Sequence, residues 1–249
     1  DGRVDVWEAD GRREPRPLKA LAPSGGRGVQ CACALGDGTA GVCVGGSAGL
    51  LRVYDTASGR LRLELAGGDA CVWGVDATRK LLASASDDRA VRLWDLRSQR
   101  AVARLAGHRA PALSAAWVGN GEVLASGDAD GTIVCWDVRR LAVDGTIDGD
   151  GAAVHALHWR EPLLFAAAAS GVVRAYDVRL SYRALVDDEV CALGGEAWAL
   201  ASVDHGGRAG RGELFCAGES DGLRRLALPS LVEMAPLGGH EGGTAALAA

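Results

Sequence analysis

The sequence predicts an all-β protein built from repeated antiparallel units, and three observations lead to this prediction. The stretch from Gly121 to Arg140 is typical of a β-hairpin, because an apolar run at 123–126 and a β-branched run at 132–136 flank the turn sequence Asp-Ala-Asp-Gly. A second copy ends at Trp94, with serine and aspartate ten and six residues before the tryptophan, as in the first copy. Degraded copies end in Tyr-Asp, so the dipeptide starts at positions 54, 94, 136 and 176, which are 40, 42 and 40 residues apart.

A repeat of about 40 to 45 residues that ends in Trp-Asp, with Gly-His upstream, is typical of WD40 repeats. Here the Gly-His step is Gly107-His108. The chain therefore resembles the WD40 β-propeller family over almost its whole length. This resemblance implies four-stranded antiparallel blades, and we expect five recognisable blades plus a partial blade at the two ends. We expect them to be part of a seven-bladed ring, because closing a six-bladed ring would leave one blade without its second strand and with unpaired edges.

The expected organisation is a single propeller domain over residues 1–249, and the start at Asp1, in mid-blade and without a leader, indicates a fragment of a longer protein. Gly-, Asp- and Ser-rich turns divide the chain into successive segments. These are a partial blade at 1–22, blades at 29–65, 71–105, 112–147 and 154–186, a degenerate blade at 197–236, and the start of another at 244–249.

Short apolar or β-branched runs between those turns supply the four strands of each blade. In the first three blades they lie at 29–35, 40–45, 50–54 and 61–65; at 71–75, 81–85, 90–94 and 101–105; and at 112–117, 123–126 and 132–136, with a weak fourth within 141–147. In the last two they lie at 154–159, 163–168, 172–176 and 182–186, and at 197–203, 213–217, 223–228 and 231–236.

Composition narrows the classes of partner and compartment. The formal net charge of −5 and the pI near 5.6 give no basic footprint for nucleic acid, so we expect no direct nucleic-acid binding. No apolar run is long enough to cross a membrane, so we expect no membrane span. The seven cysteines lack the paired spacing of a disulfide framework, which favours a reducing, intracellular location, with the cytoplasm as the first choice.

Ser, His and Asp recur with Trp, which could suggest nucleophilic catalysis, but the WD40 resemblance implies a structural tetrad instead. In that family the Gly-His histidine, a serine of the second strand, a turn aspartate and the tryptophan of the third strand form a buried hydrogen-bond network. The complete set here is His108, Ser126, Asp130 and Trp136. We expect His108→Ala to destabilise the fold by about 1 to 3 kcal/mol, because it leaves a buried polar group without its partner.

The other blades keep less of this tetrad. The blade ending in Trp94 has Ser84 and Asp88 but Gly68 in place of the histidine. The Tyr54 blade has Val44 and Ala48 at the serine and aspartate positions, and the Tyr176 blade has Ala166 and Ser170. The network is therefore expected to be complete once and reduced elsewhere.

No pattern calls for a cofactor, a metal or a catalytic residue. Cys31 and Cys33 lie two apart on one strand and share a face, but no second Cys or His pair follows at ligand spacing, so small apolar filling is the simpler reading. The sequence contains no phosphate-binding glycine loop before a helix and no His-Glu-x-x-His motif. We expect a non-enzyme and keep a propeller hydrolase as a weaker alternative.

Four tryptophans lie on or near first strands. Trp117 and Trp159 end such strands and are expected to pack in the core, whereas the sequence leaves open whether Trp73 and Trp198 are exposed.

An arginine follows the aromatic-Asp dipeptide at the same offset in three blades: Arg97, Arg139 and Arg179. The pattern resembles the W/Y-D-x-R box of substrate receptors for cullin-4 ubiquitin ligases, where the arginine faces the adaptor. The alternative is that each arginine only braces its turn. We therefore expect an interaction scaffold within a larger intracellular assembly, with a ubiquitin-ligase substrate receptor as the alternative function.

Overall fold

The computed structural model describes residues 4–8, 16–21, 28–35, 40–177, 183–204, 212–219, 223–228 and 232–234. The chain divides into two compact units, Asp1–Ala106 and Gly107–Ala249, each of which is described by itself. Every regular element in the described residues is a β-strand, and every strand pairing is antiparallel. The all-β class predicted from the sequence is confirmed.

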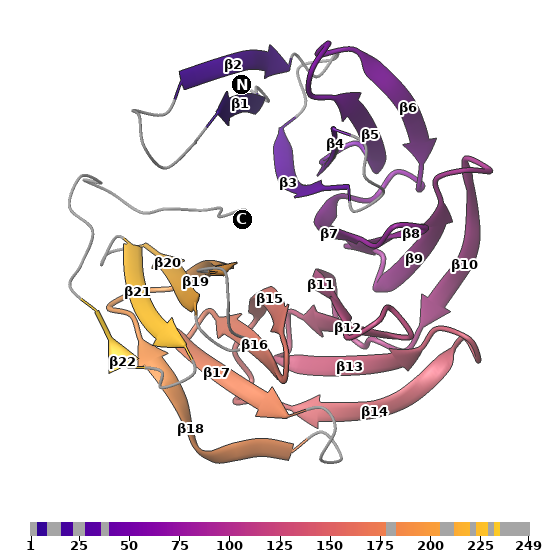
Figure 1. Ribbon diagram of the computed structural model, residues 1–249. Helices are drawn as coiled ribbons and strands as arrows, with labels where there is room; N and C mark the ends of the chain where they lie inside the picture. The colour runs from indigo at the N-terminus through magenta and orange to yellow at the C-terminus, as the bar shows by residue number, and fades with distance from the viewer. Residues whose placement is uncertain are drawn as a thin grey trace. The chain divides into compact units, whose positions relative to one another are not determined.

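The first unit contains one two-stranded sheet and two four-stranded blades (Figure 1). The two-stranded sheet pairs β1 (Val4–Glu8) with β2 (Arg16–Leu21). The first blade consists of β3 (Val29–Ala34), β4 (Gly41–Gly46), β5 (Leu50–Asp55) and β6 (Leu61–Ala66). The second consists of β7 (Val72–Ala77), β8 (Leu81–Ser86), β9 (Ala90–Asp95) and β10 (Arg100–Ala106).

The second unit contains three four-stranded blades. The first is β11 (Ala112–Val118), β12 (Val123–Asp128), β13 (Thr132–Asp137) and β14 (Ala142–Asp148). The next is β15 (Val154–Arg160), β16 (Leu163–Ala168), β17 (Val172–Asp177) and β18 (Arg183–Ala192). The last is β19 (Ala197–Asp204), β20 (Gly212–Gly218), β21 (Leu223–Leu228) and β22 (Val232–Glu233).

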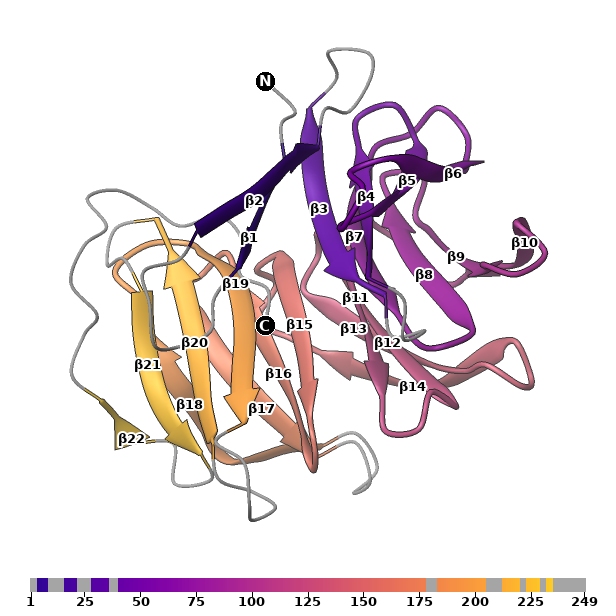
Figure 2. The same ribbon diagram turned by 45° about the horizontal axis from the view of Figure 1, so that its top comes forward.

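These sheets are propeller blades, because the strands of each pair in chain order and the first strands of consecutive blades pack together. In the first unit β3 lies against β7, and in the second β15 contacts both β11 and β19; Figure 2 shows β15 beside β19. Most strand boundaries differ from the sequence prediction by one or two residues, and the outer strands of the second unit differ more clearly. β18 extends to Ala192, β22 covers only two residues, and the fourth strand predicted within 141–147 is β14, which ends at Asp148. The strand expected at 244–249 lies outside the described residues.

Apolar side chains from facing strands fill the space between neighbouring blades. In the first unit Leu51, Leu82 and Trp94 belong to one core cluster shared by both blades. In the second unit one cluster joins the β11–β14 and β15–β18 blades, and another joins β15–β18 to β19–β22. The second strands β8, β12 and β16 are buried on both faces, which explains why they are mostly apolar or small residues in sequence.

Candidate functional site

The Ser-His-Asp-Trp group of the second unit is an internal chain of hydrogen bonds. Trp136 Nε1 donates to Ser126 Oγ over 2.7 Å, and Ser126 Oγ lies 2.6 Å from His108 Nε2. His108 Nδ1 lies 2.8 Å from a carboxylate oxygen of Asp128. The tautomer with the proton on Nδ1 satisfies every member, since the serine hydroxyl then donates to Nε2 and the imidazole donates to Asp128.

The carboxylate on His108 is that of Asp128 and not that of Asp130, the residue assigned from the sequence. Ser126 and Asp128 are two apart on β12, so their side chains share a face, and both are at most 1% exposed. Asp130 is exposed beyond the strand end, and its backbone amide donates to Asp128 Oδ1 over 3.1 Å. The period of two along β12 places Asp128 on the face of Ser126, but it does not separate Asp128 from Asp130, which lies beyond the strand end.

Burial sets the charge state of this network. Desolvation lowers the pKa of His108, and the hydrogen bond and charge of Asp128 only partly oppose that effect. The histidine is therefore neutral at pH 7. The His108 side chain is 0% exposed and that of Asp128 is 2% exposed, so substrate cannot reach either group. The arrangement resembles a catalytic triad in composition but serves as an internal cross-link between the strands.

The blade before it, β7–β10, keeps only the centre of the network. Trp94 Nε1 donates to Ser84 Oγ over 2.9 Å. Asp88 does not join this pair; its carboxylate accepts from both terminal nitrogens of Arg92 and from the amide of Ala90. The hydrogen bond from Arg92 lowers the pKa of Asp88.

An arginine two residues before the third-strand aromatic residue is a feature that the sequence interpretation missed. Arg92 occupies this position in β9, where it lies opposite Ser84, and Val134 occupies it in β13, opposite Ser126. Each blade with arginine here lacks the histidine. The signal was present as arginine at positions 52, 92 and 174, each two before Tyr or Trp.

The other two arginines also have carboxylate partners. Arg52 Nε donates to Glu64 over 2.7 Å. Arg174 donates over 2.9 Å to Asp150, which also accepts from Ser170 Oγ. Burial acts to raise the pKa of Asp150, but the Ala152 amide and Arg174 outweigh it, so the pKa is lowered. The blades with Arg52, Arg92 and Arg174 thus contain partly exposed ion pairs, whereas the β11–β14 blade contains the buried hydrogen-bond network.

Two of the three turn arginines predicted as partner contacts, Arg97 and Arg139, lie on the surface at the expected offset. Arg97 is exposed in the β9–β10 turn, and its amide donates to Asp95 Oδ1 over 2.8 Å. Arg139 follows β13, has a side chain that is 76% exposed, and forms an ion pair with Glu122. Arg179 lies outside the described residues. Arg139 therefore has a bracing contact as well as exposure.

The tryptophans divide into core and surface. Trp117 is 6% exposed, and Trp159 packs against the core cluster between β11–β14 and β15–β18. Trp73 is 38% exposed and donates from Nε1 to Asp87 over 2.8 Å. Trp198 is 36% exposed and stacks on His155, with ring centroids 4.2 Å apart.

The cysteine pair of the first strand packs as apolar filling. Cys31 and Cys33 are free thiols on β3 and contact the core cluster of the first unit. Burial raises the pKa of Cys31, which keeps that thiol protonated. Within the described residues, no group of three or more potential ligands is arranged to hold a metal ion. No helix in the same residues is long and apolar enough to cross a membrane.

Comparison with known proteins agrees with this architecture. The family model described as "WD domain, G-beta repeat" matches residues 59–95 and 99–137. Each of these segments contains the fourth strand of one blade and the first three strands of the next, β6–β9 in the first segment and β10–β13 in the second. This chain carries WD40 repeats.

Two of the similar proteins reported below are named for WD repeats. WD repeat-containing protein slp1 of Schizosaccharomyces pombe is 32% identical over 117 residues, covering 47% of this chain and 24% of the relative. F-box/WD repeat-containing protein sel-10 of Caenorhabditis elegans is 34% identical over 79 residues, covering 32% and 13%. The probable cytosolic iron-sulfur protein assembly protein 1 of Eremothecium gossypii is 39% identical over 71 residues, covering 28% and 21%. The matched segments span less than a quarter of each relative's length.

Proposed function

We propose that this WD40 chain is a non-catalytic platform for other proteins and a subunit of a larger intracellular assembly. The observation that carries the proposal is the sealing of the Ser126-His108-Asp128 group, since the side chains of His108 and Asp128 are inaccessible. That group stabilises the blade and leaves binding to the exposed turns and outer surfaces.

Two further arguments support the platform role. WD40 propeller proteins typically act as scaffolds for protein interactions, and the family is generally non-catalytic. Short, paired blades also provide a stable frame for many separate loops, each of which can contact a partner without disturbing the core. The name of the E. gossypii relative includes the word cytosolic, which supports an intracellular, cytoplasmic location for this chain as part of the proposal.

Affinity purification of the full chain from its native cell, followed by cross-linking mass spectrometry, tests this role. We expect stable protein partners cross-linked to the exposed turns. A chain that migrates only as a free monomer in native extracts contradicts the proposal. For catalysis, a fluorophosphonate probe should leave Ser126 unlabelled, and labelling of that serine in the folded chain would support the hydrolase alternative.

A ubiquitin-ligase substrate receptor is the second candidate function. The observation in its favour is the matching exposure of Arg97 and Arg139, each just after a Trp-Asp dipeptide. The variant carrying Arg97→Asp and Arg139→Asp should lose a cullin-4 adaptor that the original chain retains. The matched control carries Arg89→Asp and Arg109→Asp, which change the same charge at exposed positions outside the motif. Absence of the adaptor from every pull-down removes this candidate.

A further inference from the structure

The first unit has an open hollow of about 660 Å³ between its two four-stranded blades. Its lining comes from the end of β3, from β5 and β6, and from the β7–β8 and β9–β10 turns. This volume lies in the range of about 300 to 1,000 Å³ that is usual for small-ligand pockets, so it can accept several side chains of a bound segment. We name it the basic groove.

The exposed rim of the basic groove is rich in positive charge. Its basic residues are Arg62, Arg79, Lys80 and Arg97, and its one acidic lining residue is Asp95. Asp95 already accepts hydrogen bonds from the backbone amides of Arg97 and Ser98. In the described part of the chain, the side chains of Arg79 and Lys80 form no ion pair. A net positive rim on a chain of net charge −5 is a local departure that favours an anionic partner.

The floor of the basic groove is aliphatic. Leu35 and Val53 are buried, while three further leucines are half-buried. Those three are Leu63, Leu81 and Leu96. Four of the five belong to the core cluster or pack against it, so the floor is the edge of the core left uncovered between the blades. An aliphatic side chain bound on this floor would shield both its own apolar surface and that of the floor from water.

This combination favours a peptide over the other anionic macromolecules. Single-stranded nucleic acids are bound through bases stacked on aromatic rings, and no aromatic side chain lines the groove. A lipid surface favours flat or protruding basic and aromatic patches, whereas here the apolar residues lie below the rim. An extended acidic segment can place carboxylates at the rim and one aliphatic side chain on the floor.

We propose that the basic groove binds an acidic peptide segment of a partner protein, with an aliphatic side chain between its carboxylates. This inference rests on the proposed platform role and names the chemistry of one partner. Lys80 and Arg79 act as charge contacts, and Leu96 and Leu63 form the subsite for the aliphatic anchor.

A random peptide library displayed against the full chain tests the inference, with affinities of selected synthetic peptides measured by fluorescence anisotropy. We expect selected sequences in which Glu or Asp flanks Leu, Ile or Val. Arg79→Glu and Lys80→Glu together should weaken binding at least about tenfold, as should raising NaCl from about 50 to about 300 mM. Leu96→Ser should weaken binding while leaving the salt dependence intact.

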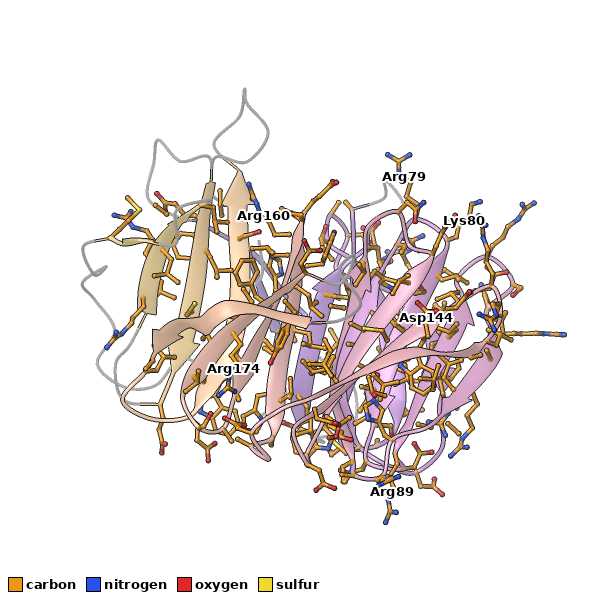
Figure 3. The ribbon with its side chains drawn as sticks, turned by 90° about the horizontal axis from the view of Figure 1, so that it is seen from below. Arg79, Lys80, Arg89, Asp144, Arg160 and Arg174 are labelled. Atoms are coloured by element: carbon orange, nitrogen blue, oxygen red, sulfur yellow. The ribbon has the colours of Figure 1, made fainter. Side chains whose placement is uncertain are left out.

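Arg89→Glu is the matched control, because Arg89 is exposed in the same unit but lies at the opposite end of the blade from Arg79 and Lys80 (Figure 3). It should leave peptide affinity unchanged, and melting temperatures should show that all variants are folded. The inference is overturned if the selected peptides lack acidic residues, or if the variant with Arg79→Glu and Lys80→Glu binds them with unchanged affinity. Groove-dependent binding of phosphatidylserine vesicles or oligo(dT) in place of peptides also overturns it. Native partners kept by the groove variants would leave the platform role standing while removing the groove as the site.

Discussion

The β7–β10 and β11–β14 blades share a sequence pattern, a strand order and a Trp-Ser hydrogen bond, but they differ in what surrounds that bond. In β11–β14 the serine, Ser126, is also hydrogen-bonded to His108, which is in turn hydrogen-bonded to Asp128. In β7–β10 the corresponding place is Gly68, and the neighbouring carboxylate of Asp88 pairs with Arg92. The comparison teaches that the Trp-Ser hydrogen bond forms with or without the histidine. In one blade a buried carboxylate accompanies the histidine, and in the other a more exposed carboxylate pairs with arginine.

Lowering the pH should destabilise the second unit more than the first, and this is the largest effect we expect. All five histidines lie in the second unit, at positions 108, 155, 158, 205 and 240. Burial lowers the pKa of His158 to about 4, with Arg160 adding to the effect, and it also lowers the pKa values of His108 and His155. A histidine with a depressed pKa binds protons better when unfolded, so its stabilisation is complete above about pH 6.5 and declines as pH falls toward the folded pKa.

When the pH is lowered from 7 to 5, His158 alone should reduce the free energy of unfolding by about 2 kcal/mol. Hydrogen exchange, corrected for intrinsic rates, should therefore show lost protection in β11–β17 and unchanged protection in β3–β10. The lowered aspartate pKa values act only below about pH 4 and leave this window unaffected. Equal loss in both units contradicts the assignment of acid sensitivity to buried histidines.

Removing the serine hydroxyl should cost more in the blade with the complete network. Ser126→Ala leaves both Trp136 Nε1 and His108 Nε2 without their partner, whereas Ser84→Ala affects only the Trp94 contact. We expect the free energy of unfolding, measured by urea denaturation, to fall by about 2 to 3 kcal/mol for Ser126→Ala and by about 1 kcal/mol for Ser84→Ala.

A double-mutant cycle sharpens this result. His108→Ala and Ser126→Ala should be non-additive by about 1 kcal/mol, because each breaks the same hydrogen bond. Additive losses would mean that the two side chains act independently.

The glycine before the histidine position provides a smaller difference. A Cβ at Gly107 would lie 2.8 Å from a ring carbon of Trp136, whose indole is held by Ser126. A Cβ at Gly67 would lie 3.1 Å from the backbone oxygen of Gly49 and 3.3 Å from the ring of Trp94, so neither contact is as close as that at Gly107. Gly107→Ala should therefore cost about 1 to 2 kcal/mol and Gly67→Ala less than that, in thermal unfolding. Equal costs would show that the ring of Trp136 moves as freely as that of Trp94.

The ion pair of β9 should give the smallest effect. Arg92→Met keeps the aliphatic stem but removes the nearer of the two arginines that pair with Asp88, whose side chain is 28% exposed. We expect a loss of about 0.5 kcal/mol at low salt and less at high salt. The pKa of Asp88, measured by NMR, should rise toward its usual value, so the loss of stability below about pH 4 becomes smaller. An unchanged Asp88 pKa contradicts the pairing.

The repeat spacing predicted the antiparallel blades, because the turns and alternating runs that set them are local. It placed Ser126, His108 and Trp136 in one group, but it could not choose between Asp128 and Asp130. Asp128 ends β12 and Asp130 lies just beyond it in the turn, so only the point at which β12 ends separates them. The Arg52, Arg92 and Arg174 pairs were harder to foresee, since their partners come from the outer strand, the hairpin turn and the inter-blade loop.

The basic groove was outside the reach of the sequence for another reason. Arg97 stood out by its offset from Trp94, but Arg62 and Arg79 carry no motif and meet it only when two blades pack. Its apolar floor looks like ordinary core sequence, because the pattern does not show where packing between two blades ends.

Gly68 makes the reduced network of β7–β10 hard to reverse. Its φ is +112°, a conformation that residues with a side chain rarely adopt, so histidine cannot simply replace it. The position that corresponds to Asp128 holds Ser86, so a carboxylate would have to be gained as well. A blade can lose its histidine by one substitution but needs a reshaped loop and a second change to regain it.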